Sequence, residues 1–336
     1  MLLFLLRRLL LVIPVLFGLL LLTFVLTRVI PADPAAALAG DQATPQQIAE
    51  IRTAYGFDRP LPEQFLHYLV QIAHGDLGSS YFTRRPVVED LIERLPATLE
   101  LTFVALLLSV GIGVPLGVVA ALHHNRWIDQ LLRIFSVGGI AIASFWLALM
   151  LQLVFAMEFD LLPLRGRLSI TGDAPADLTG CYLIDALVSG RLDIFTDALA
   201  HIALPAATLA FGSLATIVRF SRSGVLETLQ KDFVTFETAI GYPRRVVIAK
   251  YVLRNSLVST VTQIGLLFGG LIAGAVVVEA VFDWPGIGGY AAGAVFTADF
   301  QPLLGVTLLI GAVYACVNIV VDLVHAWIDP RVAEQM

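Results

Sequence analysis

The chain has 336 residues, of which 58% are hydrophobic and only 14% are charged, and its mean hydropathy is +0.84. One soluble core cannot bury that much apolar surface, so the composition excludes an ordinary soluble domain and predicts a polytopic membrane protein. The net charge of −6 argues against a nucleic-acid partner. Neither Cys181 nor Cys316 has the spacing of a metal pair or a disulfide framework, so both are read as small apolar residues.

Six stretches are long and apolar enough to cross about 30 Å of hydrocarbon, which takes roughly 20 helical residues each. They are continuous apolar runs rather than alternating segments, which predicts an all-α protein with six transmembrane helices and excludes a barrel. Arg7 and Arg8 precede the first stretch, as in a signal peptide, but its apolar core of about 20 residues is longer than a cleaved signal and predicts a retained anchor. In chain order the predicted spans cover residues 9–30, 99–122, 131–157, 200–218, 257–281 and 303–327.

The distribution of charge orients these spans. The N-terminus, the turn at 123–133, the insert at 219–254 and the C-terminal tail hold twelve of the 21 Lys and Arg residues but only six of the 27 Asp and Glu residues. The positive-inside rule therefore predicts that both termini and the 219–254 insert are cytoplasmic. Arg219, Arg222 and His201 lie at the ends of spans, where snorkelling accounts for them.

Two polar segments, 31–98 and 158–198, then lie outside, and neither is large or apolar enough to form an enzyme domain. The first contains one clear helix signal. Thr44 can cap a helix, with Gln47 in the capping-box position and Gly56 at the helix end.

The 219–254 insert carries a mixed-charge run between two apolar spans. Its first half predicts a short helix from Asp232 to Ala239, with Asp232 in the first turn, where negative charge is favoured. Gly241 ends this helix, Pro243 prevents its simple continuation, and a second helix from Arg244 to Asn255 leads into the fifth span. From composition alone, the hairpin is either an amphipathic element on the membrane surface or a docking element for a soluble partner.

The motifs that identify a family run through nearly the whole chain. They include LLFLLRRLLLVIPVLFGLLLLTF, IPADP, FDRPLPEQFLHYL, HGDLGSSYFTRRPV, LPATLEL, LPLRGR, HIALPAATLAFGSLATIVRFSRSGVLE, DFVTFETAIG followed by LRNSL, FDWPGIGGY and VNIVVDLVHAWIDPR. Together and in this order they resemble the first permease subunit of the dipeptide/oligopeptide/nickel importers, a family of ABC transporter permeases. The family usually carries basic residues where this chain has FVTFETAIG, so the ionic contacts made at that point differ here.

The resemblance implies an importer-type ABC permease fold in the cell inner (plasma) membrane, with no catalytic residue, no metal site and no cofactor bound by this chain. The implied partners are a second permease subunit, two ATPase subunits or domains that bind ATP and Mg, an extracytoplasmic substrate-binding protein, and membrane lipid. The implied parts are residues 1–30 with the first span, an outer segment 31–98, a permease core 99–328 with outer loop 158–198 and coupling segment 219–254, and a cytoplasmic tail 329–336.

The resemblance also assigns roles to residues of the insert. Phe233, Val234 and Phe236 would form an apolar knob in a socket of the ATPase, and Gly241, which matches the family together with Ala239, would be the pivot. Asp232 and Glu237 would set the register against basic groups. Movement of this knob would rock the bundle between inward-open and outward-open states, which ATP can drive only through different contacts in the two states.

Three other places carry alternatives. The turn at Trp284, Pro285 and Gly286, with Gly288 and Gly289, is either an interfacial anchor for the tryptophan or an outer gate. Asp322 either lines the pathway and meets a peptide amine, or pairs with a basic residue or caps a helix near the cytoplasmic edge. Glu279 is expected at the outer interface. The glycines of spans two and five are expected to allow close helix packing.

Two other classes of protein fit less well. An intramembrane enzyme needs a catalytic motif such as HExxH, and none is present; His123 and His124 lack carboxylates spaced as metal ligands. A secondary transporter would show inverted repeats and charges at mid-membrane, and would work without an ATPase. The chain has no GxxxxGK[ST] motif, so transport by an importer of this kind depends on a separate ATPase. The resemblance implies a dipeptide or oligopeptide as cargo, or alternatively a cationic peptide, a polyamine or a nickel chelate.

Overall fold

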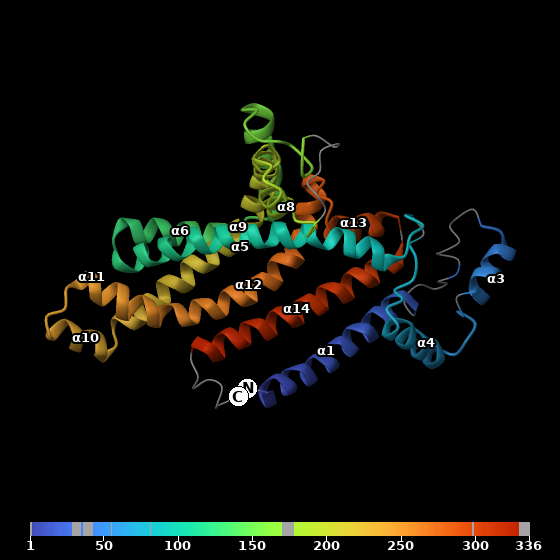
Figure 1. The fold of residues 1–336 in the computed structure, drawn as a ribbon, viewed down its shortest axis with the longest axis horizontal. Coiled ribbons are helices and arrows are strands. Elements are labelled where there is room, and N and C mark those ends of the chain that lie inside the picture. The colour runs from blue at the N-terminus through green and yellow to red at the C-terminus, as the bar shows by residue number, and fades with distance from the viewer. Residues whose placement is uncertain are drawn as a thin grey trace. The chain divides into compact units, whose positions relative to one another are not determined.

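The computed structural model describes residues 2–28, 35, 43–54, 56–80, 82–169, 178–297 and 299–328. Within these residues the chain is helical, apart from turns and one isolated bridge between Ser79 and Pro86 (Figure 1). The predicted all-α class is therefore confirmed. The helices are α1 (Leu2–Arg28), α3 (Pro45–Ala54), α4 (Leu61–Ala73), α5 (Val87–Leu122), α6 (Trp127–Ala141), α7 (Ser144–Leu151), η1 (Gln152–Glu158), α8 (Tyr182–Val188), α9 (Leu192–Leu229), α10 (Asp232–Ala239), α11 (Arg244–Val246), η2 (Val247–Val252), α12 (Leu253–Phe282), α13 (Ile287–Phe296) and α14 (Phe300–Ile328).

Four of the described helices are long and apolar enough to cross a membrane, and a bent pair raises the number to five if it counts as one span. Four predicted spans overlap the single long helices α5, α9, α12 and α14. The first predicted span falls on α1, where Val12–Val25 is a shorter apolar helix among the described residues. Six transmembrane helices therefore remain a prediction.

The predicted continuous span 131–157 differs most from the structure. It is broken between α6 and α7, and the direction of the helix changes by 104° at the break. The break consists of Ile142 and Ala143, whose backbones are extended, with ψ of 125° and 131°. No proline marks the bend, and apart from Ser144 the residues next to it are apolar or glycine, so hydropathy alone predicts one straight helix across it.

The chain divides into two compact units. The first unit is Met1–Leu95 with Gly286–Cys316, and the second is Pro96–Pro285 with Val317–Met336. The first unit has a core around Val87, Leu91 and Ile287. In the second unit α9 packs against α6, α7, α8 and α12, around a core that includes Leu101, Ile202 and Phe282.

Glycines let helices of the second unit approach closely, as the sequence predicts. A Cβ on Gly117 would lie 2.6 Å from Cβ of Ser221, and a Cβ on Gly265 would lie 2.2 Å from Cγ2 of Val321. Gly111 and Gly270 differ, because a Cβ there meets nothing within 4 Å. The packing role therefore holds for some of these glycines and not for others.

Candidate functional site

The hairpin that the sequence predicts between the fourth and fifth spans is present in the second unit. Helix α10 begins at Asp232 and ends at Ala239, the bounds that the sequence predicts. Lys231 precedes it in an extended conformation and links it to the end of α9. Asp232 lies in the first turn, where its charge opposes the positive end of the helix dipole.

Gly241 reverses the chain after α10. Its φ is +95°, a region that side-chain-bearing residues rarely adopt. The Gly241 N–H donates to the Thr238 carbonyl (3.1 Å) and the Tyr242 N–H donates to the Glu237 carbonyl (3.3 Å), which is the hydrogen-bond pattern of a Schellman cap. A Cβ on Gly241 would meet no atom within 4 Å, so the requirement for glycine is conformational rather than steric.

One face of α10 is anchored to its own unit. Val234 is only 7% exposed and packs in a cluster with Ala121, Val225, Val247 and Val252, to which the partly buried Phe233 adds contacts. The Thr238 hydroxyl donates to the Val234 carbonyl at 2.7 Å. The prediction that Val234 belongs to a protruding knob is therefore wrong, because its side chain fills a core that residues of α5 and α9 complete.

The opposite face of the hairpin leaves apolar side chains uncovered. Phe236 is 63% exposed and Ile240 is 58% exposed, and Tyr242 is exposed beyond the turn. Asp232 and Ala239 are also exposed, whereas Glu237 is half-buried. Sequence reasoning included Phe236 and missed Ile240 and Tyr242, because which side chains face outward depends on how Val234 is held.

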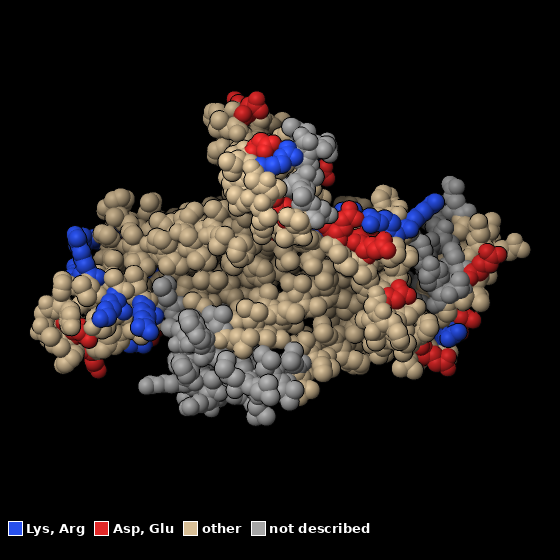
Figure 2. Space-filling view, viewed as in Figure 1, with Lys and Arg blue, Asp and Glu red and all other residues tan. Residues whose placement is uncertain are grey.

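The second half of the hairpin continues into α12. α11 leads through the π-helical turn η2 directly into α12, so the predicted helix after Pro243 is confirmed. The rings of Tyr242 and Tyr251 meet edge to face at 6.1 Å between centres. Burial, followed by the Glu237 charge and Tyr242, raises the pKa of Tyr251. Lys and Arg side chains gather around this end of the second unit (Figure 2).

A buried ion pair stiffens the helix ends next to the hairpin. The Asp129 carboxylate is fully buried and accepts from Arg222 Nη2 (2.9 Å), Arg133 Nη2 (3.3 Å) and the Asn125 N–H (3.0 Å). The sequence predicts that Arg222 snorkels at the end of a span. In the structure its side chain instead ties the start of α6 to α9. No sequence signal links Arg222 to a carboxylate 93 residues earlier.

The Trp284 turn lies at the other end of α12, a helix of 30 residues and about 45 Å. Trp284 is 3% exposed, and its indole N–H donates to the Ala97 carbonyl at 2.9 Å. This burial contradicts an anchor at the lipid surface. Asp283, with φ of +50°, turns the chain. The non-helical turn ends at Gly286, and Gly288 and Gly289 are helical residues of α13 rather than parts of the turn.

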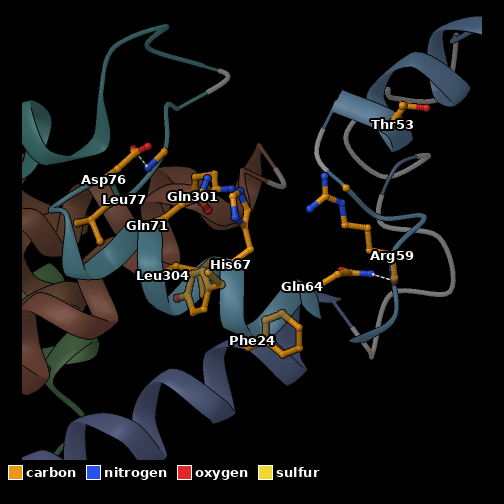
Figure 3. Close-up of a pocket in the computed structure, with 13 residues that line it drawn as sticks. Phe24, Thr53, Arg59, Gln64, His67, Gln71, Asp76, Leu77, Gln301 and Leu304 are labelled. Carbon is orange, nitrogen blue, oxygen red and sulfur yellow. Dashed lines mark hydrogen bonds between the residues drawn. The ribbon is translucent and has the colours of Figure 1, made fainter. Parts of the chain in front are cut away.

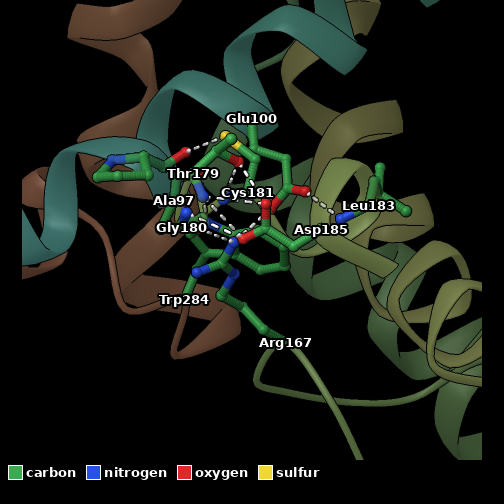
Figure 4. Close-up of polar contacts among 10 residues, drawn as sticks. Ala97, Glu100, Arg167, Thr179, Gly180, Cys181, Leu183, Asp185 and Trp284 are labelled. Atoms are coloured by element: carbon green, nitrogen blue, oxygen red, sulfur yellow. Dashed lines mark hydrogen bonds and ion pairs between the residues drawn. The ribbon is translucent and has the colours of Figure 1, made fainter. Parts of the chain in front are cut away.

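Arg167 lies at the centre of the contacts around Trp284 (Figure 4). Its guanidinium pairs with the buried Glu100 carboxylate, donates to the Gly180 carbonyl at 3.0 Å, and lies 3.7 Å from the ring centre of Tyr182. It also lies 5.4 Å from the ring centre of Trp284. We call Glu100, Arg167, Tyr182 and Trp284 the outer knot, after the predicted outer loop 158–198, because these residues tie that loop to α5 and to the end of α12.

Two other predicted positions have different outcomes. Glu279, expected at the interface, is buried inside the second unit and accepts from the Thr98 hydroxyl at 2.6 Å. His201 is buried too, with Nδ1 2.8 Å from the Asp197 carbonyl. Asp322 belongs to α14, but its side chain lies outside the described part of the structure, so both readings of Asp322 remain predictions.

The first unit contributes a polar pocket of about 220 Å³ (Figure 3). Arg59, His67, Gln71 and Gln301 line it. The predicted capping box of this region is confirmed, since the Thr44 N–H donates to Gln47 Oε1 at 2.9 Å. Among the residues that the structure describes, no group of three His, Cys, Asp or Glu side chains is arranged to hold a metal ion.

Comparison with known proteins shows that two family models match this chain. Residues 113–334 match the family described as "Binding-protein-dependent transport system inner membrane component", and residues 1–102 match the one described as "Binding-prot-dependent transport system membrane comp, N-term". Both matches fall on a single chain and together cover most of it.

Relatives of similar length match along almost the whole chain. The "Probable D,D-dipeptide transport system permease protein DdpB" of Escherichia coli (strain K12) is 43% identical over 315 residues, which cover 94% of this chain and 93% of the relative. The "Dipeptide transport system permease protein DppB" of Alkalihalophilus pseudofirmus is 38% identical over 330 residues, 97% of this chain and 98% of the relative. The "Glutathione transport system permease protein GsiC" of Salmonella typhimurium is 33% identical over 327 residues, 97% of each chain.

Proposed function

The chain belongs to the family of inner membrane components of binding-protein-dependent transport systems, and from this membership we propose that it forms half of the translocation pathway of an ATP-driven importer of short peptides. It is a membrane permease subunit and not an enzyme. The proposed cargo follows the relatives, whose names specify D,D-dipeptides, dipeptides and glutathione. Cationic peptides, polyamines and nickel chelates are the alternatives that a transport assay separates.

The proposed topology has six spans with both termini in the cytoplasm, an outer segment at 31–98, the permease core at 99–328 and the tail at 329–336. The 219–254 hairpin then faces the cytoplasm, in agreement with its Lys and Arg content. The proposed partners are a second permease subunit, two ATPase subunits that bind ATP and Mg, and an extracytoplasmic binding protein. Trp284, Pro285 and Gly286 remain a proposed outer gate, and Asp322 a proposed pathway residue.

The observation that carries the coupling proposal is the two-sided character of α10. Val234 holds the helix on its own unit, while Phe236 and Ile240 expose their apolar side chains on the hairpin. Exposed apolar side chains beside charged residues are typical of a protein interface. We place Phe236, Ile240 and Tyr242 in a socket of the ATPase, with Asp232 and Glu237 beside basic groups of that partner and Gly241 as the pivot.

Coupling in this scheme is mechanical. Closure of the ATPase dimer on ATP displaces α10, and the continuous helix from α11 through η2 to α12 carries that displacement into the bundle. The buried cluster around Val234 and the Asp129–Arg222 pair make α10 and the helix ends move together. The displacement can favour one state only if the ATPase contacts differ between inward-open and outward-open states.

A co-purification experiment tests the proposal. The chain would be produced with its second permease, ATPase and binding protein, and ATP-dependent uptake of labelled D-Ala-D-Ala and L-Ala-L-Ala would be measured in phospholipid vesicles. Phe236→Ala should lower ATPase recovery about tenfold or more, as removal of a central interface aromatic does. Thr235→Ala, at the neighbouring exposed position, is the matched control. Normal recovery and uptake with Phe236→Ala would remove α10 from the interface.

A further inference from the structure

The bend between α6 and α7 opens onto a hollow of about 350 Å³ within the second unit. α9 and α12 supply the other walls. None of the described residues that line the hollow is charged. The hollow therefore lies among helices suited to cross the bilayer, at the break in a candidate span that the described residues show.

The walls of the hollow combine hydroxyl groups with bare backbone. The hydroxyls are those of Ser144, Thr208, Ser213 and Thr216. The Thr216 hydroxyl donates to the Gly212 carbonyl at 3.0 Å, and the Thr208 hydroxyl donates to the Leu204 carbonyl at 2.8 Å. Because these two threonine hydroxyls donate their only proton within their own helix, their oxygens keep lone pairs that can accept a further hydrogen bond.

Glycines keep the hollow open. Gly139, Gly212, Gly270 and Gly274 line it. A Cβ on Gly270 would meet no atom within 4 Å, and the nearest atom to a Cβ on Gly212 would be the Gly139 carbonyl oxygen at 3.8 Å. A side chain at Gly270 would therefore project into open space without a clash in its own unit.

The bend adds further polar groups of the main chain. Ala143 precedes α7 without a side-chain cap, so the first N–H groups of that helix lack the partner that a capping side chain supplies. Non-helical backbone at membrane depth is tolerated where protein buries it or where it lines a water-filled cavity. The hollow thus offers neutral donors and acceptors in a setting that is otherwise apolar.

We propose that this hollow is part of the cargo path and that it holds the amide groups of a short peptide through neutral hydrogen bonds; this inference rests on the proposed function. The absence of charged groups among its described lining residues fits the neutral peptide bonds of such a cargo, though not its charged termini, and fits a polyamine or a metal chelate less well, because these need carboxylates or other charged ligands. Because the hydrogen bonds are made to the backbone of the cargo, its side chains contribute little to recognition. This part of the path therefore tolerates many peptide sequences.

The test compares two glycines that both have open space around the added side chain. Gly270→Leu narrows the hollow, whereas Gly111→Leu places the same side chain on α5, away from it. In vesicles that contain the complete transporter, Gly270→Leu should lower dipeptide uptake about tenfold, because pore diameter controls passage, and Gly111→Leu should leave uptake near the wild-type rate. Both variants should keep the second permease and the ATPase on purification.

Three outcomes would overturn the proposal. Wild-type uptake by Gly270→Leu would show that the cargo does not pass the hollow. Loss of the second permease from Gly270→Leu alone would make the hollow a subunit interface. Equal loss of uptake in Gly270→Leu and Gly111→Leu would remove the distinction between the two sites. Failure of the wild-type transporter to import any peptide would instead overturn the proposed function.

A second pair of variants covers the case in which Gly270→Leu does not fold. Thr216→Val removes a half-buried hydroxyl and preserves its shape, and Thr216→Ser restores the hydroxyl. The readout is the ratio of L-Ala-L-Ala uptake to uptake of the same dipeptide methylated on its peptide nitrogen. That ratio should fall severalfold in Thr216→Val and recover in Thr216→Ser, because only a hydroxyl can accept from the peptide N–H. An unchanged ratio in Thr216→Val would overturn the proposal.

Discussion

The two ends of α12 differ in which side chains they bury and which they leave exposed. At the hairpin, apolar side chains such as Phe236 and Ile240 remain exposed, and a single buried valine holds the helix in place. At the outer knot, charged and aromatic side chains are buried, and Glu100 and Arg167 are paired inside the protein. One end leaves apolar side chains uncovered, and the other pairs its buried charges within the unit, although Arg167 Nε has no hydrogen-bond partner there.

The comparison separates two uses of buried polar interactions. A buried ion pair adds little net stability, but removal of one partner leaves a costly unpaired charge. The outer knot therefore fixes the 158–198 loop in one arrangement. The hairpin relies on a local cap at Gly241 and on apolar packing, which can shift by small amounts without leaving a charge unpaired. The hairpin is the end suited to move.

Removal of the central cation should have the largest effect. Arg167→Ala leaves the Glu100 carboxylate buried without its guanidinium and should destabilise the second unit by about 3–5 kcal/mol. Thermal unfolding of the purified protein in detergent measures this loss. Arg191→Ala removes an exposed pair with Asp193 and should cost at most about 1 kcal/mol. Equal effects of the two variants would show that the knot does not fix the loop.

Gly241 gives the sharpest test of the hairpin. Gly241→Val places a β-branched residue at φ of +95°, which should cost about 1–3 kcal/mol of local stability without any clash. The number of ATP molecules hydrolysed per imported dipeptide should rise in reconstituted vesicles, while membrane insertion stays normal. Gly241→Asn is the matched control, because asparagine tolerates positive φ better. A wild-type ratio for Gly241→Val would contradict the pivot role.

The sequence predicts the hairpin well because its signals are local. Asp232, Gly241 and Pro243 lie within a dozen residues and act on the same short helix. The same holds for Thr44 and Gln47, whose capping box needs only three residues. Such elements form through contacts between near neighbours, so their bounds follow from the printed sequence.

The remaining features depend on contacts between distant parts of the chain. Val234 faces inward because Ala121 and Val225 complete a core there. No local sequence pattern predicts these contacts. Trp284 is buried because Ala97 and Arg167 lie beside it. The bend after α6 joins two apolar helices, and hydropathy does not distinguish a bent span from a straight one.

A smaller effect is expected from the tryptophan of the outer knot. Trp284→Phe keeps most of the aromatic packing but removes the indole N–H that donates to the Ala97 carbonyl, and the net loss of this hydrogen bond should cost about 0.5–1.5 kcal/mol. Trp146→Phe, at a half-exposed position on α7, is the matched control and should cost less. Thermal unfolding in detergent distinguishes the two. If Trp284→Phe is as stable as Trp146→Phe, the hydrogen bond contributes nothing to the knot.

The smallest effect is a shift in thiol reactivity that reports on both ends of α12 at once. Burial, followed by the Glu100 charge, raises the pKa of Cys181, whose Sγ lies 3.7 Å from the Pro96 carbonyl in the knot. Only the thiolate reacts with iodoacetamide, so the alkylation rate of Cys181 depends on pH. In a Cys316→Ser background this rate should reach half its maximum at a pH above about 8.5, the pKa of a free thiol. In a Cys181→Ser, Cys316→Ser background, Phe236→Cys on the exposed hairpin should titrate near that free value. Coincident profiles would mean that the knot does not shield Cys181, and the contrast between a closed end of α12 at the knot and an open end at the hairpin would fail there.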